Sequence, residues 1–411
     1  MPNRRKSGFW RASFVAAAMI ALSACNPNRF VSGWVPYWSA PEGRAGFTDS
    51  AVTSMFSDVS PFFFSALPNG TIGLVGSAFE LNTTVHQAHI RGLNVLPSIT
   101  DGSGKLVMAA LLADPASRAQ HIANIVSLTA TYPEIDGVDL DYEGFAFSDG
   151  RASWPTTQTV WRAFVSELAT ALHNNGKLLS VTIPPTWIAA NGETGYPVYD
   201  QAFIGVVADR IRLMVYDWSV SSPGPISPIT WLNQVIAYSN AALPNYKSKL
   251  QLGIPAYGRN WGRKVNGAEI CPDGALSTSS IQLQNMPALI AAHGASPTRD
   301  VNSGEMYFSY DTVATGYSTA PIPAPPYVPP PNVAPRVAAP ASGTALQPAL
   351  RLTPPTEQLS CTVRHFVYYP DATAIQQHAQ AALNAGWSGV VLWALGYETA
   401  DVYAALANTT P

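Results

Sequence analysis

Short apolar runs alternate with amphipathic stretches from residue 30 to the end of the chain, a pattern typical of a parallel sheet connected by helices. Eight runs are expected to be strands: residues 30–38, 58–66, 93–100, 137–143, 178–184, 211–217, 250–257 and 389–395. Helical patterns lie between them, at residues 116–132, 156–175, 229–240 and 372–385. Asp371 is placed to cap the last of these helices. Eight such units predict an α/β fold, a (β/α)8 TIM barrel. A doubly wound open sheet is the alternative, but no glycine-rich phosphate loop follows the first strand.

An insertion at residues 262–360 interrupts the repeat between the seventh and eighth strands. It contains a helical segment at 279–293, a strand-like segment at 306–311, and a stretch at 320–355 in which 12 of 36 residues are proline. Such a proline-rich stretch cannot pack as helix or sheet, so it is expected to be a spacer, with a cell-wall or docking motif as the alternative. Cys271 and Cys361 bracket the insertion, and in an exported protein we expect them to form a disulfide. A zinc site is not expected, because no second pair of ligands accompanies Cys271.

The first 25 residues have the features of an export signal. A positively charged start is followed by a largely apolar run at 12–24, which is short for a membrane span. Residues 22–25, LSAC, resemble the bacterial lipobox, which implies that Cys25 is lipidated and becomes the new N-terminus. We expect 1–25 to be the lipoprotein signal and 26–411 to form the catalytic barrel. We therefore expect an exported protein anchored to the outer face of a bacterial membrane, within the cell envelope, by its N-terminal lipid alone. The alternative is an ordinary cleaved signal and a secreted protein.

The charge balance excludes one class of partner. With a net charge of -3 and 12% charged residues, the chain has no basic surplus for binding the phosphates of nucleic acid. The 11 tryptophans suit a surface that stacks on flat ligands, although most are expected to fill the core. Nothing in the pattern implies a metal or an organic cofactor, and we expect a monomer.

The segment DGVDLDYEG at 136–144 concentrates carboxylates in an apolar strand. Because side chains alternate along a strand, Asp139, Asp141 and Glu143 share one face. In a barrel that face is the interior, and the row ends at the rim where such barrels build active sites. Buried together, the three groups must retain a proton near neutral pH, which favours acid catalysis. A hard-metal site and a purely structural polar cluster are the other interpretations, and a glycoside hydrolase fits best.

Four segments together resemble glycoside hydrolase family 18, the family of chitinases and N-acetylglucosaminidases. DGVDLDYE matches its DGxDxDxE signature, and Met214 to Asp217 resemble its MxYD motif. LGIPAYGRNW at 252–261 and Trp393 in VVLWALGYE match its seventh and eighth strands. Residues 223–231 and the WALGYE segment are similar to the branch that contains spore-cortex peptidoglycan N-acetylglucosaminidases.

The resemblance implies a retaining mechanism in which the substrate assists. Glu143 would protonate the glycosidic oxygen, while the 2-acetamido group attacks the anomeric carbon to give an oxazolinium intermediate. Asp141 would hold the acetamido N–H, Asp139 would share a proton with Asp141, and Tyr216 would donate its hydroxyl to the acetamido group. Asp136, on the opposite face, would support the strand.

The remaining family positions imply substrate contacts. Asp217 would bond the sugar beside Met214, Trp393 would form the floor of the site, and Tyr257, Arg259 and Trp261 would contact neighbouring subsites or pack behind them. Further candidates for stacking on sugars are Trp38, Trp187 and Trp218. The substrate would be a β-1,4-linked polysaccharide containing N-acetylglucosamine, either chitin or peptidoglycan. The alternatives are a catalytically silent, lectin-like lipoprotein that binds glycans, which the retained Glu143 disfavours, and a two-lobed sugar-uptake lipoprotein, which the eight-unit pattern disfavours.

Overall fold

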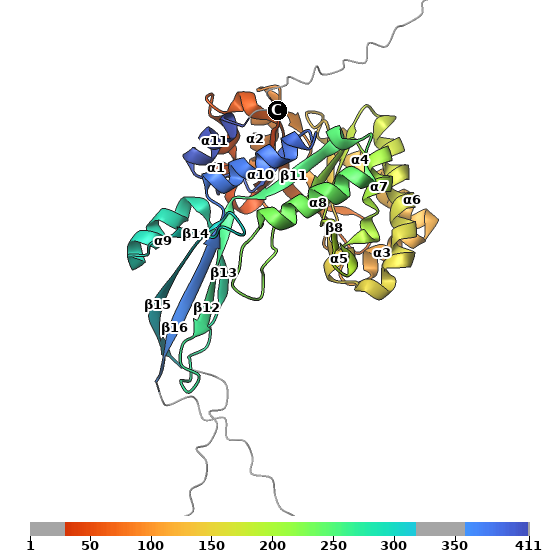
Figure 1. The fold of residues 1–411 in the computed structure, drawn as a ribbon. Helices are drawn as coiled ribbons and strands as arrows, with labels where there is room; N and C mark the ends of the chain where they lie inside the picture. Colours follow the sequence, from red (N-terminus) through yellow and green to blue (C-terminus); the bar gives the residue numbers. More distant parts are fainter. Residues whose placement is uncertain (1–28, 318–357, 410–411) are drawn as a thin grey trace, which may run out of the picture.

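Eight parallel strands close into a barrel, and helices pack around its outside (Figure 1). The computed structural model describes residues 29–317 and 358–409. The barrel strands are β1 (Val31–Pro36), β2 (Phe56–Ala66), β5 (Ser98–Asp101), β6 (Gly137–Asp141), β7 (Leu178–Ile183), β10 (Arg210–Leu213), β11 (Leu250–Pro255) and β17 (Gly389–Trp393). Each pairs with the next in chain order, and β17 pairs with β1 to close the ring. The (β/α)8 prediction is therefore confirmed, and the open-sheet alternative is wrong.

The helices bury one face each against the barrel. In α6, for example, Trp161, Phe164, Leu168 and Leu172 recur every three or four residues and are fully buried. Asp371 caps α10, where its side chain accepts a hydrogen bond from the Ala374 N–H. The helices around the barrel are α1 (Ala40–Thr48), α2 (Ala78–His89), α3 (Val107–Ala113), α4 (Pro115–Thr131), α5 (Gly144–Phe147), α6 (Trp154–His173), α7 (Gln201–Val207), α8 (Ile229–Ala242), α10 (Ala372–Asn384) and α11 (Ala400–Ala407).

Several predicted strands end earlier than expected, each for a local reason. The strand expected at 93–100 is split into β4 (Asn94–Val95) and β5, because Pro97 between them has no N–H for a ladder. The strand expected at 211–217 ends at Leu213, and Asp217 beyond it has a φ of 59°, which is incompatible with a strand. Short strands add to the barrel rim: β3 (Ile72–Leu74) pairs with β2, and β8 (Thr186–Ala189) pairs with β9 (Gly192–Gly195).

Between β11 and β17 the chain forms a second, antiparallel sheet with the order β13-β12-β16-β15-β14. Its strands are β12 (Tyr257–Lys264), β13 (Thr278–Gln282), β14 (Thr298–Arg299), β15 (Met306–Gly316) and β16 (Leu359–Tyr369). We call β12, β13, β15 and β16 the arm, because they project from the barrel as an elongated unit (Figure 1). The sheet begins at Tyr257, before the expected boundary at residue 262, since the chain leaves β11 directly into β12.

The helix expected at 279–293 is shorter in the structure. Residues 278–282 pair with β12 as strand β13, Leu283–Asn285 form a 3-10 turn, and the α-helix, α9, is confined to Met286–His293. The apolar residues of this segment have no helical spacing strong enough to override pairing with β12. The strand expected at 306–311 exists and is longer, because β15 pairs with β16 along its whole length, from Met306 opposite Tyr369 to Gly316 opposite Leu359.

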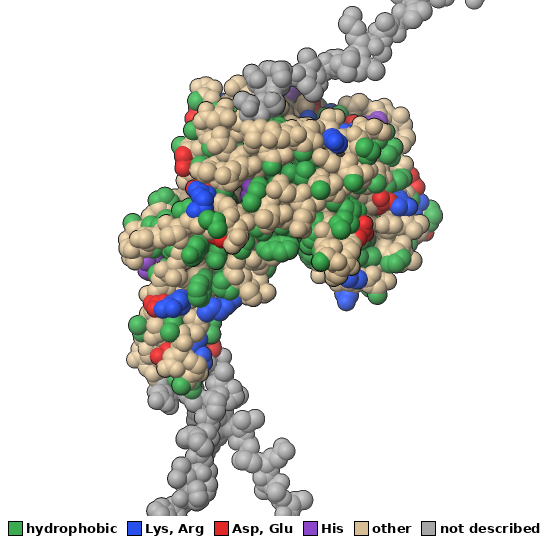
Figure 2. Space-filling model, viewed as in Figure 1, with side chains coloured by type: hydrophobic (Ala, Val, Ile, Leu, Met, Phe, Trp, Pro, Cys, Tyr) green, Lys and Arg blue, Asp and Glu red, His purple; other side chains and the backbone are tan. Residues whose placement is uncertain are grey.

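A disulfide joins Cys271 to Cys361, which ties the loop between β12 and β13 to β16. The export signal at 1–25, with Cys25, and the proline-rich stretch at 320–355 lie outside the described residues. Within residues 29–317 and 358–409, no helix is both long and apolar enough to cross a membrane. Figure 2 shows that the molecule is hollowed between the arm and the part of the barrel that carries α3 and α5.

Candidate active site

Strand β6 directs its acidic side chains into the barrel and ends at the rim. All five of its residues are buried, with Asp139 fully inaccessible and Asp141 only 3% exposed. Glu143 lies two residues past the strand and precedes the first turn of α5, so its side chain reaches the open end of the barrel. On the opposite face, Asp136 accepts a hydrogen bond of 2.8 Å from the Val95 N–H and so fastens β6 to β4. The predicted alternation therefore produces a row of three carboxylates that rises from the core to a cavity.

Asp139 is held by partners from four other strands of the barrel. Its Oδ2 accepts hydrogen bonds from Trp34 Nε1 at 2.9 Å and Ser98 Oγ at 2.8 Å, and Thr182 Oγ1 donates to its Oδ1 at 3.0 Å. An Nη1 of Arg212 lies 3.2 Å from Oδ2. Asp139 is thus an ion-pair partner of Arg212, whereas the sequence analysis expected it to share a proton with Asp141.

Asp141 and Glu143 both favour the protonated form. Burial, followed by the charges of Glu143 and Asp139, raises the pKa of Asp141 well above its usual value, against an opposing effect of Arg212. Burial, followed by the charge of Asp217, raises the pKa of Glu143 from 4.5 to about 7. Among the described residues, Asp141 Oδ1 has no hydrogen-bond partner. The pair therefore holds a proton near neutral pH, as a general acid requires.

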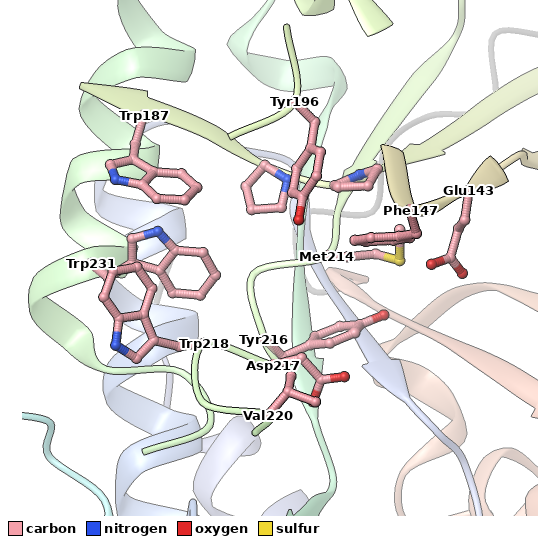
Figure 3. A pocket seen from close by; sticks show the side chains of 12 residues that line it. Glu143, Phe147, Trp187, Tyr196, Met214, Tyr216, Asp217, Trp218, Val220 and Trp231 are labelled. Atoms are coloured by element: carbon pink, nitrogen blue, oxygen red, sulfur yellow. The ribbon is translucent and has the colours of Figure 1, made fainter. Parts of the chain in front are cut away.

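Tyr216 and Asp217 follow β10 and face the same cavity. Burial, followed by Tyr257, Asp141, Glu143 and Asp217, raises the pKa of Tyr216 well above its usual value, so its hydroxyl remains a donor. Figure 3 shows this hydroxyl pointing toward the side of the cavity where Glu143 and Met214 lie.

Asp217 is engaged by residues of the arm. Arg259 Nη2 lies 2.7 Å from its Oδ2, and the Tyr257 hydroxyl donates to its Oδ1. Because these two partners occupy its oxygens, Asp217 is held in place at a φ of 59°, a conformation that residues other than glycine rarely adopt. Tyr257 is only 5% exposed and its hydroxyl is bonded to Asp217, so we interpret it as a support for Asp217.

Trp261 packs behind the site, the second of the two roles expected of it. Its side chain is fully buried, and its Nε1 donates a hydrogen bond of 2.8 Å to the Val220 carbonyl. It therefore supports the loop after β10 from behind and does not line the cavity.

The cavity has a volume of about 620 Å³, and six of its twelve lining residues are aromatic. Trp187, Trp218 and Trp231 pack edge-on or tilted against one another, with ring centroids 5.0 to 5.9 Å apart (Figure 3). Trp218 is 47% exposed, so its ring is available to a ligand, while Trp231 is buried behind it. The residues that line the cavity are Glu143, Phe147, Pro184, Pro185, Trp187, Tyr196, Met214, Tyr216, Asp217, Trp218, Val220 and Trp231.

A second aromatic group surrounds Trp393 at the end of β17. Its ring meets Phe62 at 5.0 Å, Trp34 at 5.7 Å and Trp38 at 6.3 Å, all edge to face. Trp38 is 51% exposed, and its Nε1 donates to the Tyr397 hydroxyl at 2.7 Å. Trp34 connects the aromatic group around Trp393 with the row of carboxylates. Its ring contacts Trp393, and its indole N–H donates to Asp139.

Several residues of the site were missed by sequence reasoning. Phe147, Tyr196 and Trp231 line the cavity from α5, from the loop after β9 and from α8, and only the three-dimensional arrangement brings them together. Arg212 and its second partner, Asp58, are 154 residues apart in the chain. The one available signal was an arginine in the middle of the apolar run RIRLMV, where a buried charge requires a partner.

Comparisons with known proteins agree with this geometry. The family model "Glycosyl hydrolases family 18" matches residues 34–398. Over 214 residues the chain is 22% identical to the cortical fragment-lytic enzyme of Bacillus anthracis, a match that covers 51% of this chain and 47% of that enzyme. The chain thus spans about half the length of this curated relative.

Two solved structures share the fold. A chitinase from Chromobacterium violaceum superimposes with a TM-score of 0.66 at 20% identity, covering 92% of this chain and 98% of that chain. The spore cortex-lytic enzyme SleL from Bacillus megaterium superimposes with a TM-score of 0.68 at 17% identity, covering 93% and 74%. With the acidic row of β6 at the mouth of the barrel and a family match over most of its length, the chain belongs to glycosyl hydrolase family 18.

Proposed function

We propose that the protein is a retaining glycosidase that cleaves β-1,4 linkages next to N-acetylglucosamine in chitin or peptidoglycan. The observation that carries this proposal is the convergence of Glu143 and Tyr216 at one cavity with six aromatic lining residues, with Asp141 buried next to Glu143 in the same row of carboxylates. A pKa raised to about 7 allows Glu143 to hold a proton near neutral pH and to donate it to a glycosidic oxygen. The retained acid also argues against a lectin, which would have no use for it.

The nucleophile in this proposal is the substrate itself. A protein nucleophile would need a second free carboxylate facing the sugar across from Glu143. Asp141 is buried behind Glu143, and Asp217 is occupied by Arg259 and Tyr257. The 2-acetamido oxygen of the bound sugar therefore attacks the anomeric carbon as Glu143 protonates the leaving oxygen. The oxazolinium intermediate that results is opened by water, with overall retention of configuration.

The neighbouring side chains have defined roles in this scheme. Asp141 accepts the acetamido N–H and offsets the positive charge that develops, and Tyr216 donates its hydroxyl to the acetamido oxygen. Trp393 forms the floor under the reacting sugar, and Trp218 stacks on a sugar further along the chain. The relatives named for chitin and for spore cortex support a polymer of N-acetylglucosamine as the substrate.

The location of the protein is part of the proposal. The leader at 1–25 and the lipobox cysteine, Cys25, would export the chain and anchor it as a monomer to the outer face of a bacterial membrane. The Cys271–Cys361 disulfide supports an oxidising compartment. Mass spectrometry of the intact protein from membranes tests this part, because a Cys25 lipid adds a mass that a merely cleaved leader does not.

The activity is tested by incubating residues 26–411 with chitin oligosaccharides and with purified peptidoglycan, followed by mass spectrometry of the products. Glu143→Gln should abolish cleavage, whereas Glu134→Gln, at an exposed site outside the cavity, should not. Residual activity above about a hundredth of wild type in Glu143→Gln would remove it as the general acid. Binding of both glycans without cleavage would instead identify a lectin.

Two further readouts test the mechanism. NMR of the first product should show the β-anomer, because the configuration is retained. Glucosamine oligomers without acetyl groups should not be cleaved, since they lack the internal nucleophile. Cleavage of these deacetylated oligomers at a rate comparable to chitin oligomers would contradict substrate assistance.

A further inference from the structure

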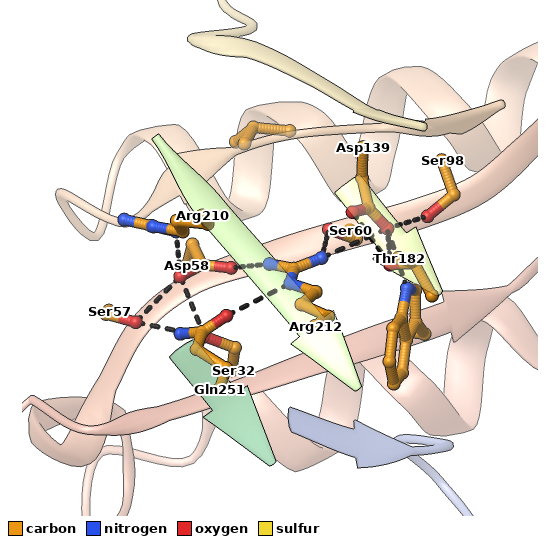
Figure 4. A network of polar contacts seen from close by, with 12 residues as sticks. Ser32, Ser57, Asp58, Ser60, Ser98, Asp139, Thr182, Arg210, Arg212 and Gln251 are labelled. Atoms are coloured by element: carbon orange, nitrogen blue, oxygen red, sulfur yellow. Dashed lines mark hydrogen bonds and ion pairs between the residues drawn. The ribbon is translucent and has the colours of Figure 1, made fainter. Parts of the chain in front are cut away.

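A fully buried arginine lies beneath the acidic row. Arg212, in the middle of β10, has no exposed side-chain surface and lies between Asp58 of β2 and Asp139 of β6 (Figure 4). Its Nη1 also donates to Ser60 Oγ at 2.6 Å, and its Nε donates to Gln251 Oε1 at 3.0 Å. The guanidinium thus bonds residues from three other strands of the barrel and does not line the cavity.

The charges in this network balance. Arg210 and Arg212 both pair with Asp58, and Arg212 also pairs with Asp139, so two cations face two carboxylates. Burial alone would raise the pKa of Asp58, but Arg210, Arg212 and the hydroxyls of Ser57 and Ser32 lower it below its usual value. An ionised pair in the core is costly unless every partner is present, so Arg212 requires its carboxylates to remain charged.

The donors around Asp139 favour its ionised form, because three of them converge on one oxygen, Oδ2. Trp34 Nε1 and Arg212 Nη1 can only donate, and both point at Oδ2, to which Ser98 Oγ also donates. Thr182 Oγ1 donates to Oδ1 at 3.0 Å and lies 3.2 Å from Oδ2. In contrast, Asp141 Oδ1 has no partner among the described residues and can carry a hydrogen.

We propose that Arg212 is a positioning residue that keeps Asp139 ionised and thereby confines the proton of the acidic row to Asp141 and Glu143. The assignment of Asp141 and Glu143 to the reaction rests on the proposed function. The charged side chains around this row are Arg212 from β10, Asp58 behind it on β2, and Asp217 beyond β10. The titratable hydroxyls near its outer end belong to Tyr196, Tyr199 and Tyr216. The strands β1, β5 and β7 present only neutral donors to Asp139: Trp34, Ser98 and Thr182.

The consequence for catalysis is a defined proton count. Because Arg212 balances the negative charge of Asp139, the Asp141–Glu143 pair titrates as one unit in two steps. The active form holds a single proton, which Glu143 delivers while Asp141 is left negative beside the developing cation. Without Arg212, Asp139 would compete for this proton, and a smaller fraction of the molecules would hold it where the reaction needs it.

The test is the titration of the Asp139 carboxyl carbon by NMR in protein labelled with ¹³C at aspartate Cγ, with Asp139→Asn used to assign the signal. In the wild type we expect the chemical shift of an ionised carboxylate, unchanged between pH 5 and pH 8. A wild-type Asp139 that titrates in this range, or is protonated throughout it, would overturn the proposal. This readout needs no substrate, so it stands or fails independently of the glycosidase activity.

Variants then identify Arg212 as the cause. Removing the arginine alone would leave two buried carboxylates, Asp58 and Asp139, with Arg210 as the one cation of the network, so Asp58→Asn and Arg212→Met are combined, which leaves one cation and one carboxylate. Asp139 should then titrate between pH 5 and pH 8. Arg212→Lys keeps a positive charge at this position, so Asp139 should show the ionised signal in that variant. An Asp139 that stays ionised in the folded double variant would show that Arg212 does not hold its charge. On chitin oligosaccharides, kcat of the double variant should fall about tenfold, the effect of a pKa mismatch of about one unit, with KM little changed.

Discussion

Glu143 should lower the stability of the folded protein at alkaline pH, and Glu143→Gln should therefore stabilise it there. The pKa of Glu143 is raised from 4.5 to about 7, first by burial and then by Asp217. A folded-state pKa above the unfolded value means that the folded protein binds this proton more tightly. The stability that neutral Glu143 contributes is complete below about pH 4.5 and is lost as the pH rises through about 7.

The magnitude follows from the size of the shift. A rise from 4.5 to about 7 corresponds to at most about 3.4 kcal/mol of unfolding free energy, at about 1.36 kcal/mol per unit. Because Glu143 lies at the mouth of the cavity and is partly exposed, solvent reduces this figure, and we expect about 1–3 kcal/mol. Gln cannot ionise, so the variant should be more stable than wild type by this amount at pH 8.5 and about equal to it at pH 4.5.

Denaturant unfolding at the two pH values, followed by circular dichroism with the disulfide intact, measures this difference. Glu134→Gln is the matched control: its side chain is 40% exposed and outside the cavity, so its effect on the free energy of unfolding should be small at either pH. A Glu143→Gln variant that is no more stable than wild type at pH 8.5 would refute the reasoning, because ionisation of Glu143 would then not lower the free energy of unfolding.

Three further predictions concern the site and the arm. Asp217→Asn removes the charge that helps to raise the pKa of Glu143, so the alkaline limb of the kcat profile should move down by about half a pH unit; an unmoved limb would exclude this coupling. Tyr216→Phe should lower kcat about 10- to 100-fold with KM within about threefold, and a change in KM alone would contradict a role in the transition state. Reduction of the Cys271–Cys361 disulfide, which spans 90 residues, should lower the melting temperature, as the chain-entropy model assigns it up to about 4–5 kcal/mol; two free thiols in the oxidised protein would refute the pairing.

The sequence predicted the fold and the acidic row well because both depend on local periodicity. Alternation along β6 placed Asp139 and Asp141 inside the barrel, and the eight repeated units predicted its closure. The prediction did less well where distant segments decide the outcome. Trp261 matched a family position for substrate contact, yet it is buried because the loop after β10 folds over it and accepts its hydrogen bond.

The role of Asp139 shows the same limit. From β6 alone, its only visible partner was Asp141, so a shared proton was the natural expectation. The structure adds Arg212, which comes from β10 and brings Asp58 from β2 into the same network. No local pattern relates these three strands, and closure of the barrel is what brings their charges together.

The arm cannot be exchanged between related proteins on its own, which matters for protein engineering. Its first strand supplies Tyr257 and Arg259 to Asp217, and the side chain of Trp261 supports the loop that follows. At its base, Glu305 accepts hydrogen bonds from the N–H groups of Ile226 at 2.8 Å and Ser227 at 2.5 Å, in that same loop. A transplanted arm of the same shape but without these side chains would leave Asp217 without its partners. Asp217 would then stand unsupported near Glu143, whose pKa it helps to raise. Exchange between relatives would therefore have to carry the arm and the loop after β10 together as one unit.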